Sequence, residues 1–279
     1  MTGKKLYNDL TEALNEPLNV ELLDLSHKYV QDIPYEIENL KNLRKLNLKD
    51  NELDFLPDSI DNLKNLEWLD IQQNYITYLP DSICNLKNLE YINIISNDLT
   101  YLPDNIGDMI NLKWMYLSHN NLEKLPESIS QLKLLELIYI ENNIIAEFPE
   151  QLCGLTSIKE INIGNNEIKN FPARISGLIN LYFLALHDNK IEQLPDDLSK
   201  LKKLSKLDLH SNKLAYLPKS FSKMVNLEYV NLSNNELKEL PENIEELTKL
   251  IYMNLFSNNI SNDEKERIKL LLPKTEFDW

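Results

Sequence analysis

Two histidines, His187 and His210, lie 23 residues apart, and Asp208 precedes the second of them by two residues. On neighbouring parallel strands these three side chains would project side by side. Two imidazoles and a carboxylate can hold a metal ion. Exposed polar residues are nevertheless the usual occupants of such strand positions. We therefore interpret the group as a solvated polar surface and expect no metal.

Other arrangements that could carry chemistry are weaker. Ser118 precedes His119, but adjacent strand residues point to opposite sides of a sheet, so the two cannot act as nucleophile and base. The chain has five glycines and no glycine-rich phosphate loop. It contains no nucleophile elbow and no CxxC or HxxxH spacing that would favour zinc. We expect no catalytic residues and no cofactor, and an enzyme is disfavoured.

The two cysteines, Cys84 and Cys153, are separated by three times the same 23-residue spacing. Neighbouring strands of a sheet lie about 4.8 Å apart, so the two sulfur atoms are expected roughly 15 Å apart or more. That distance is beyond the reach of a disulfide bond. Both thiols are therefore expected to be free and reduced.

The 23-residue spacing runs through most of the chain as the pattern LxxLxLxxNxL, then xxLP, then xxIxxLxx. The proline of this pattern recurs ten times, which leaves only Pro17 and Pro273 outside the period. A fixed period of this length indicates a solenoid, in which each repeat packs on its neighbours. The asparagine of the pattern recurs without interruption at Asn51, Asn74, Asn97, Asn120, Asn143, Asn166, Asn189, Asn212, Asn235 and Asn258.

The residues of one repeat predict its local structure. Met115 and Leu117 point inward from a short strand. The alternate residues Trp114, Tyr116 and Ser118 point outward. The proline suits the first position of a short helical segment, where no amide donor is needed. Each repeat ends by starting the next in the same direction, so the strands must form a parallel ladder.

This pattern resembles the leucine-rich repeat family, of the type found in bacterial repeat proteins and in intracellular eukaryotic scaffolds. The resemblance covers residues 20–260. It implies an α/β solenoid with the shape of a horseshoe, in which a parallel strand ladder lines the concave face and short helical turns lie on the convex side. The family binds many partners through one architecture, so the motif is specific for fold and weak for function.

The recurrent asparagine is expected to form a buried ladder. An amide side chain offers both a donor and an acceptor to a bent backbone. A solvated turn is the alternative, but a turn alone would also tolerate Asp, Gly or Ser. Lys28 takes the place of the asparagine in the first repeat, where no preceding repeat needs support.

Both ends of a solenoid expose core and need caps. Residues 4–15 are predicted to form an amphipathic helix that buries Leu6, Leu10 and Leu14. At the other end, an S-x-x-E capping box over residues 261–264 begins a second helix.

Pro273 ends this second helix, and the alternation in residues 275–279 predicts a last short strand that covers the core with Phe277 and Trp279. We therefore divide the chain into an N-terminal helical cap (1–19), about eleven leucine-rich repeats (20–260) and a C-terminal helix-and-strand cap (261–279).

Composition limits the classes of partner. A net charge of -15 repels phosphate backbones and anionic lipid, so we expect neither nucleic acid nor membrane as a partner. No apolar run approaches the roughly 20 residues of a membrane helix, and the start MTGKKLYNDL lacks the apolar segment of a signal peptide. We expect a cytoplasmic monomer whose partners are neutral or basic.

The outward strand positions depart from the average repeat in one region. The third position of the repeat is aromatic in six of eleven cases, and the fifth is Asp or Asn in eight. The fifth position becomes Tyr116, Tyr139 and Ala185 in the other three repeats. These departures lie beside two tryptophans. They predict one apolar patch at the centre of the concave face, formed by Trp68, Tyr91, Ile95, Trp114, Tyr116, Leu137, Tyr139 and Phe183.

Exposed apolar patches usually mark interaction sites, and Trp and Tyr dominate the binding energy of interfaces. The sequence therefore favours a non-enzymatic module that binds a protein or peptide on its concave aromatic face. Two alternatives remain open. The aromatic residues could bind a carbohydrate or another small ligand, or they could stabilise the strand ladder of a passive spacer.

Overall fold

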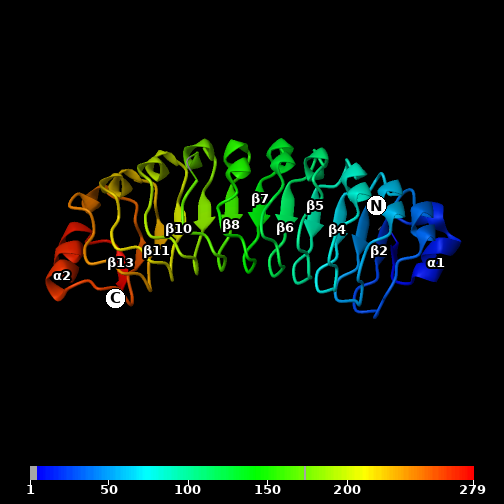
Figure 1. The fold of residues 1–279 in the computed structure, drawn as a ribbon, viewed down its shortest axis with the longest axis horizontal. Helices are drawn as coiled ribbons and strands as arrows, with labels where there is room; N and C mark the ends of the chain where they lie inside the picture. The colour runs from blue at the N-terminus through cyan, green and yellow to red at the C-terminus, as the bar shows by residue number, and fades with distance from the viewer. Residues whose placement is uncertain (1–4, 173) are drawn as a thin grey trace. The chain divides into compact units, whose positions relative to one another are not determined.

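The computed structural model describes residues 5–172 and 174–279. Within these ranges the chain folds into two compact units, one ending at Asn143 and the other beginning at Ile144. Figure 1 colours the first unit from blue to green and the second from green to red. Each unit is a solenoid of short strands and helical turns.

The strands of each unit form a parallel ladder in which every strand pairs with the next one in the sequence. Equivalent residues of successive repeats are paired in the sheet, as Trp68 is with Tyr91. The first unit contains β1 (Leu6–Tyr7), β2 (Leu22–Asp24), β3 (Lys45–Asn47), β4 (Trp68–Asp70), β5 (Tyr91–Asn93), β6 (Trp114–Tyr116) and β7 (Leu137–Tyr139). The second unit contains β8 (Glu160–Asn162), β9 (Phe183–Ala185), β10 (Lys206–Asp208), β11 (Tyr229–Asn231), β12 (Tyr252–Asn254) and β13 (Glu276–Asp278).

Between the strands the chain forms short 3-10 helices and, near its ends, two α-helices, α1 (Leu10–Asn15) and α2 (Asn262–Leu271). The 3-10 helices of the first unit are η1 (Pro17–Asn19), η2 (Tyr35–Asn39), η3 (Asp58–Asn62), η4 (Asp81–Asn85), η5 (Ile106–Asp108) and η6 (Glu127–Gln131). Those of the second unit are η7 (Glu150–Gly154), η8 (Ile175–Gly177), η9 (Asp196–Lys200), η10 (Lys219–Lys223) and η11 (Ile244–Glu246).

The repeated proline lies just before a helical turn, one position earlier than we predicted. Pro57 has the extended backbone of an N-cap residue, with φ -69° and ψ 150°. Its carbonyl oxygen accepts the N–H of Ile60 at 3.0 Å, which is the first hydrogen bond of η3. The proline ring therefore fixes the chain direction at the entry to the turn, while its carbonyl starts the turn.

The hydrophobic core lies between the strands and the helical turns of each unit. The central residue of a strand is buried, as in Leu69 of β4 and Met115 of β6. Leu117, which follows β6, and Ile129, within η6, are fully buried as well. The predicted inward positions are therefore confirmed. None of the helices in the described residues is long and apolar enough to cross a membrane.

The recurrent asparagine is buried, as expected, and it connects adjacent repeats. Asn120 is 7% exposed, and the residue before it, His119, has a left-handed backbone with φ 56°. The Asn120 Nδ2 atom donates to the carbonyl oxygens of Ile94, Leu117 and Ser118 at 2.9, 3.0 and 3.2 Å. Its Oδ1 atom accepts the N–H of Leu99 at 3.0 Å. The amide thus holds the bend of its own repeat to the repeat before it.

The N-terminal prediction was partly wrong. Residue 4 of the expected helix lies outside the described residues, and Leu6 belongs to strand β1, where its side chain is 58% exposed. The helix α1 begins only at Leu10, because the side chain of Asp9 caps it by accepting the N–H of Glu12 at 2.8 Å. Tyr7 and Ala13 provide the buried contacts of this end.

The C-terminal prediction was largely correct. Ser261 caps α2 by accepting the N–H of Glu264 at 3.2 Å. The carboxylate of Glu264 accepts the N–H of Leu240 at 3.0 Å and pairs with Arg267, so it ties α2 to the last repeat. The chain then forms β13, and the rings of Phe277 and Trp279 stack with centroids 5.0 Å apart.

We expect Asn120→Ala to lower the free energy of unfolding by about 1 to 3 kcal/mol, because buried carbonyl oxygens and one buried N–H lose their partners. Asn121→Ala is the matched control, since this neighbouring side chain is exposed. Chemical denaturation of both variants measures the difference. Equal stability of the two variants would contradict the role given to the buried amide.

Candidate functional site

Four aromatic side chains of the first unit form a continuous row, which we call the ring column: Trp68, Tyr91, Tyr116 and Tyr139. The rings of Trp68 and Tyr91 stack with centroids 5.0 Å apart and planes 11° apart. The centroid of Tyr91 lies 5.4 Å from that of Tyr116, and Tyr116 meets Tyr139 edge-on at 5.5 Å. The parallel strands β4 to β7 position these rings at the repeat distance.

Three further residues of the predicted patch lie on the same strands or just after them. Trp114 is paired in the sheet with Tyr91 on one side and with Leu137 on the other. Ile95 is half-buried two residues beyond the end of β5. Phe183 belongs to β9 of the second unit, where it pairs with Glu160 and Lys206. The first unit thus brings together seven of the eight predicted residues on strands β4 to β7.

The patch residues are half-buried, not freely exposed as we expected for Trp68. Stacked rings cover part of each other's surface, so outward orientation on a strand does not give full exposure. Ser118 was also expected to face water, but it is only 1% exposed. A serine side chain is shorter than those of Ile95 and Glu141, which occupy the equivalent positions of the adjacent repeats, and this difference in length accounts for its burial.

The Asp or Asn at the fifth position has a structural role that the sequence did not reveal. Its side-chain oxygen accepts the backbone N–H two residues later, as Asn93 does from Ile95 at 3.1 Å. Asn47, Asn162 and Asn231 make the same contact in their repeats. A tyrosine side chain cannot reach back in this way, so Tyr116 and Tyr139 replace a backbone acceptor with an aromatic ring.

Asp70 lies beneath the ring column and is 7% exposed, which corrects the expectation that it faces water. Its carboxylate accepts the N–H of Gln72 at 3.0 Å and the amide of Asn93 at 3.2 Å. Burial raises the pKa of Asp70 above its ordinary value, and these hydrogen bonds only partly oppose the effect. Burial also raises the pKa of Tyr91 to about 12, so its phenol stays neutral at physiological pH.

A shallow groove adjoins the ring column at its N-terminal end. Its lining includes the outward side chains Leu6, Leu22, Lys45 and Trp68, one from each of the strands β1 to β4. The groove and the ring column share Trp68. The outward surface from β1 to β7 therefore offers a groove followed by a row of rings.

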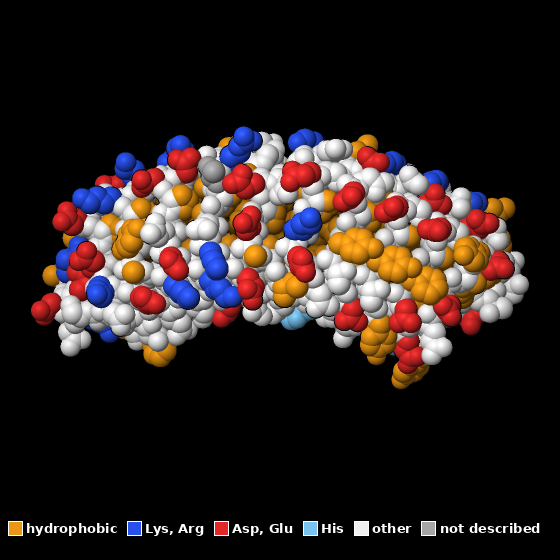
Figure 2. All heavy atoms as spheres, viewed as in Figure 1, with side chains coloured by type: hydrophobic (Ala, Val, Ile, Leu, Met, Phe, Trp, Pro, Cys, Tyr) orange, Lys and Arg blue, Asp and Glu red, His pale blue; other side chains and the backbone are white. Residues whose placement is uncertain are grey.

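The exposed aromatic residues of the first unit lie elsewhere, and our reading of the strand positions missed them. Phe55, Tyr78 and Tyr101 immediately precede the Leu-Pro pair of three successive repeats and are 41%, 45% and 54% exposed. Figure 2 shows a group of hydrophobic side chains over the first unit on the face drawn. Applying the 23-residue period to the position before Leu-Pro would have identified this second set of aromatic residues.

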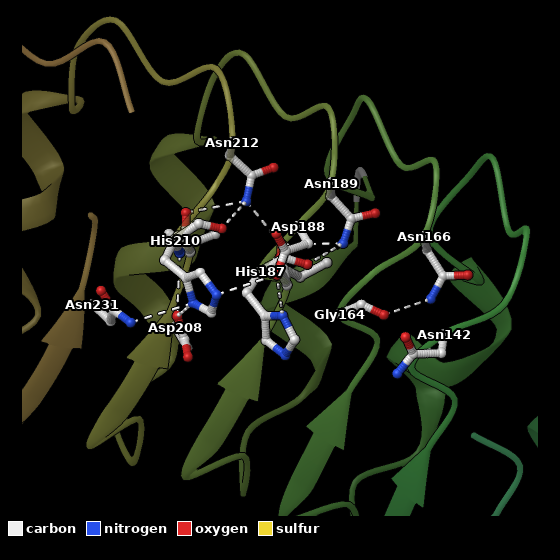
Figure 3. Close-up of polar contacts among 12 residues, drawn as sticks. Asn142, Gly164, Asn166, His187, Asp188, Asn189, Asp208, His210, Asn212 and Asn231 are labelled. Atoms are coloured by element: carbon white, nitrogen blue, oxygen red, sulfur yellow. Dashed lines mark hydrogen bonds and ion pairs between the residues drawn. The ribbon is translucent and has the colours of Figure 1, made fainter. Parts of the chain in front are cut away.

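The second unit contains the polar group that the sequence singled out. The imidazoles of His187 and His210 stack with centroids 4.7 Å apart and planes 5° apart. The carboxylate between them comes from Asp188, which the sequence analysis did not name (Figure 3). Asp208 instead contacts the far nitrogen of His210. Both cysteines are free and buried, as expected, and burial raises the pKa of each thiol to about 12.

Comparison with protein families agrees with the repeat pattern. A family described as "Leucine-rich repeat region" matches residues 20–113. A second, described as "Leucine Rich Repeat", matches residues 111–132 and 226–247. A search of curated proteins found no match to the chain.

Solved structures agree with the same fold. A leucine-rich repeat protein of Leptospira interrogans is 28% identical, with 99% of this chain and 100% of that chain covered and a TM-score of 0.54. A TDR receptor is 27% identical over 99% of this chain, with a TM-score of 0.84. The plant peptide hormone receptor RGFR1, solved in complex with RGF2, is 22% identical over 91% of this chain, with a TM-score of 0.73. The chain spans about half the length of these two receptors, at 50% and 46%.

We expect Asp70→Asn to raise the free energy of unfolding at pH 7 by about 0.5 to 1.5 kcal/mol, the size of one buried hydrogen-bonding effect. The asparagine keeps the acceptor for Gln72 and removes a buried charge. A carboxyl with a raised pKa in the folded protein favours folding most below its unfolded pKa of about 3.9, and this advantage is lost as pH rises through the folded value. The gain from the substitution should therefore shrink as pH falls towards 4.

Denaturation curves of the wild type and Asp70→Asn between pH 4 and pH 7 measure this gain, with the exposed Asp54→Asn as control. A gain that is constant with pH, or a loss of stability at pH 7, would contradict the argument from charge burial.

Proposed function

Because this chain is a leucine-rich repeat protein, we propose that it is a non-enzymatic interaction module whose first unit binds an extended segment of a protein or peptide partner. The binding surface is the ring column together with Trp114, Leu137, Ile95 and the adjoining groove. Leucine-rich repeat proteins commonly serve as protein-protein interaction modules, and RGFR1 was solved in complex with RGF2. The partner proposed here is neutral or basic.

The observation that carries the proposal is the replacement of the fifth-position acceptor by Tyr116 and Tyr139. In most of the other repeats an Asp or Asn at this position supports the backbone two residues later. Giving up this contact in two adjacent repeats removes a local stabilising contact and gains an aromatic surface. Tyr and Trp are the residues that contribute most binding energy at interfaces.

The charge of the surface favours a partner with basic residues. The protein carries a net charge of -15, and the carboxylates of Asp24 and Asp70 lie along the same strands as the groove and the ring column. Arginine and lysine bind both to carboxylates and to the faces of aromatic rings. An extended partner with alternating basic and apolar side chains would therefore fit this surface.

The ring geometry argues against carbohydrate binding. A sugar stacks on the open face of an aromatic ring, but one face of Trp68 and one face of Tyr91 are already stacked on each other. A passive spacer remains the main competitor, because the same stacking also stabilises the ladder. Stability and binding measurements on the same variants separate these two roles.

We expect Trp114→Ala and Tyr139→Ala each to weaken a peptide ligand by about 2 kcal/mol or more, roughly 30-fold in Kd. Each substitution should cost only about 0.2 to 1 kcal/mol of stability, because it removes cross-strand contacts and no core. Tyr229→Ala is the matched control, since it occupies the third position of a repeat in the second unit. Its binding should equal that of the wild type.

Peptides selected from a displayed random library against the wild-type protein supply the ligands, and fluorescence titration supplies Kd. The exposed set Phe55, Tyr78 and Tyr101, replaced together by serine, tests the competing surface. Peptides that bind Trp114→Ala normally but lose affinity for the serine variant would move the site away from the strands. If no peptide is selected and Trp114→Ala melts much earlier than the wild type, the spacer is correct.

We expect Leu117→Ala to destabilise the protein by about 2 to 5 kcal/mol through lost transfer energy and a cavity. Leu117 is fully buried and comes directly after Tyr116, so this pair separates core from surface in one strand. Thermal or chemical denaturation measures the effect, and the variant should bind the selected peptides normally at temperatures where it is folded. A loss of affinity in the folded variant would show that core packing also shapes the binding surface.

A further inference from the structure

We propose that His187, Asp188 and His210 in the second unit form a binding site for one late transition-metal ion, with Zn²⁺ as the reference ligand. The three residues lie on adjacent repeats and each offers one ligand atom, and these atoms lie within 4.8 Å of one another. The site is independent of the aromatic surface in the first unit. Figure 3 shows the group and its neighbours.

The distances between the ligand atoms suit a small ion. The Asp188 Oδ2 atom lies 3.0 Å from His187 Nδ1 and 3.2 Å from His210 Nε2. Zinc bonds of about 2.0–2.2 Å in a tetrahedral arrangement place two ligand atoms roughly 3.3 Å apart. Small side-chain rotations are therefore enough to admit the ion. Two imidazoles favour zinc or copper over calcium and magnesium, which prefer oxygen ligands.

The hydrogen bonds of His210 leave a nitrogen lone pair facing a carboxylate. The His210 Nδ1 atom lies 2.7 Å from Asp208 Oδ1 and 3.3 Å from the Nδ2 atom of Asn231. The shorter contact, to a charged acceptor, requires the proton on Nδ1, which then donates it to Asp208. A neutral His210 therefore presents an unprotonated Nε2 to Asp188 Oδ2 at 3.2 Å. Only a cation between these two atoms, a proton or a metal ion, makes the contact favourable.

The residues around the site orient its ligands in the way that metal centres require. Ligating histidines usually donate their other ring N–H to a carboxylate, which fixes the tautomer and the ring direction. Asp208 provides this contact for His210, and it also accepts the backbone N–H of His210 at 3.2 Å. Asp208 is therefore a positioning residue, not a ligand.

Two backbone features place the remaining ligands. Asp188 has a left-handed backbone with φ 49°, in the bend that precedes Asn189, so its side chain turns back between the two imidazoles. Gly164 lies against the ring of His187, because a Cβ atom at this position would collide with that ring. The other described repeats carry a side chain at the position of Gly164. Its absence here leaves the space that the imidazole occupies.

Three protein ligands leave at least one coordination position open for water, as in zinc sites that are not purely structural. The side chains of His187 and His210 are 20% and 27% exposed, and that of Asp188 is 46% exposed. An ion can therefore enter from solvent without opening the core.

The test uses protein without an affinity tag, freed of metal with a chelator and titrated with Zn²⁺ by calorimetry. We expect one equivalent to bind and to raise Tm. His210→Ala and His187→Ala should each lose this binding. Asp208→Asn should weaken it by about 10- to 100-fold, the usual effect of removing the partner of a ligating histidine. Gly164→Ala, which displaces the His187 ring, should weaken it as well.

His119→Ala is the matched control, because this histidine is exposed and belongs to the first unit. Its zinc binding and its zinc-dependent rise in Tm should equal those of the wild type. Co²⁺ replaces Zn²⁺ in a second measurement, since its visible absorption reports the ligand set. Tm without metal shows that each variant is folded.

Two results would overturn the proposal. The wild type could show neither a zinc-dependent rise in Tm nor Co²⁺ absorption, which would leave a proton as the cation between His210 and Asp188. Alternatively, the variants of His187 and His210 could bind zinc as the wild type does, which would assign the ion to other residues.

Discussion

The side-chain amide of the recurrent asparagine is the interaction on which the rest of the structure depends. Each repeat leaves its strand through a left-handed residue, and this bend directs carbonyl oxygens towards the interior. A buried carbonyl without a donor is costly. The amide supplies that donor to its own bend and to the preceding repeat, as Asn97 does for Ile94 and Ile71. Its oxygen binds the N–H of Ile76, which belongs to the preceding repeat.

The amide contacts also explain why function can be arranged in columns. Within each unit they hold successive repeats in a single register, so equivalent side chains lie one strand apart along the ladder. Aromatic rings at that distance stack, as Trp68 and Tyr91 do, and imidazoles stack in the same way at His187 and His210. A single substitution therefore changes the contacts of two neighbouring repeats, and a run of substitutions produces an extended surface.

The sequence predicted the features that follow from periodicity alone. The inward leucines, the strand positions, the buried asparagines and the C-terminal capping serine depend on spacing within one repeat, so the pattern was sufficient. Asp70, Ser118 and Leu6 were assigned the wrong environment for a different reason. Their exposure depends on the size of side chains in adjacent repeats, or on which end of the ladder a short segment joins, and a single repeat does not contain that information.

The polar group in the second unit shows the same limit more sharply. Strand alternation placed His187 and His210 side by side, but it assigned the third partner to Asp208, which shares their outward orientation. Asp188 lies in the bend, where alternation no longer applies, and only its left-handed backbone directs its carboxylate to the imidazoles. The space left by Gly164 is likewise invisible in the pattern, since it concerns a collision across repeats.

The half-burial of the ring column has a consequence for binding. Rings that already stack lose little side-chain freedom when a partner covers them, because their orientation is fixed in the free protein. The part of each ring that remains exposed is the part that a partner would remove from water. Inward leucines hold the strands beneath this surface, so stability and binding depend on alternate residues of the same strand. The solenoid can therefore change its outward residues without disturbing its core.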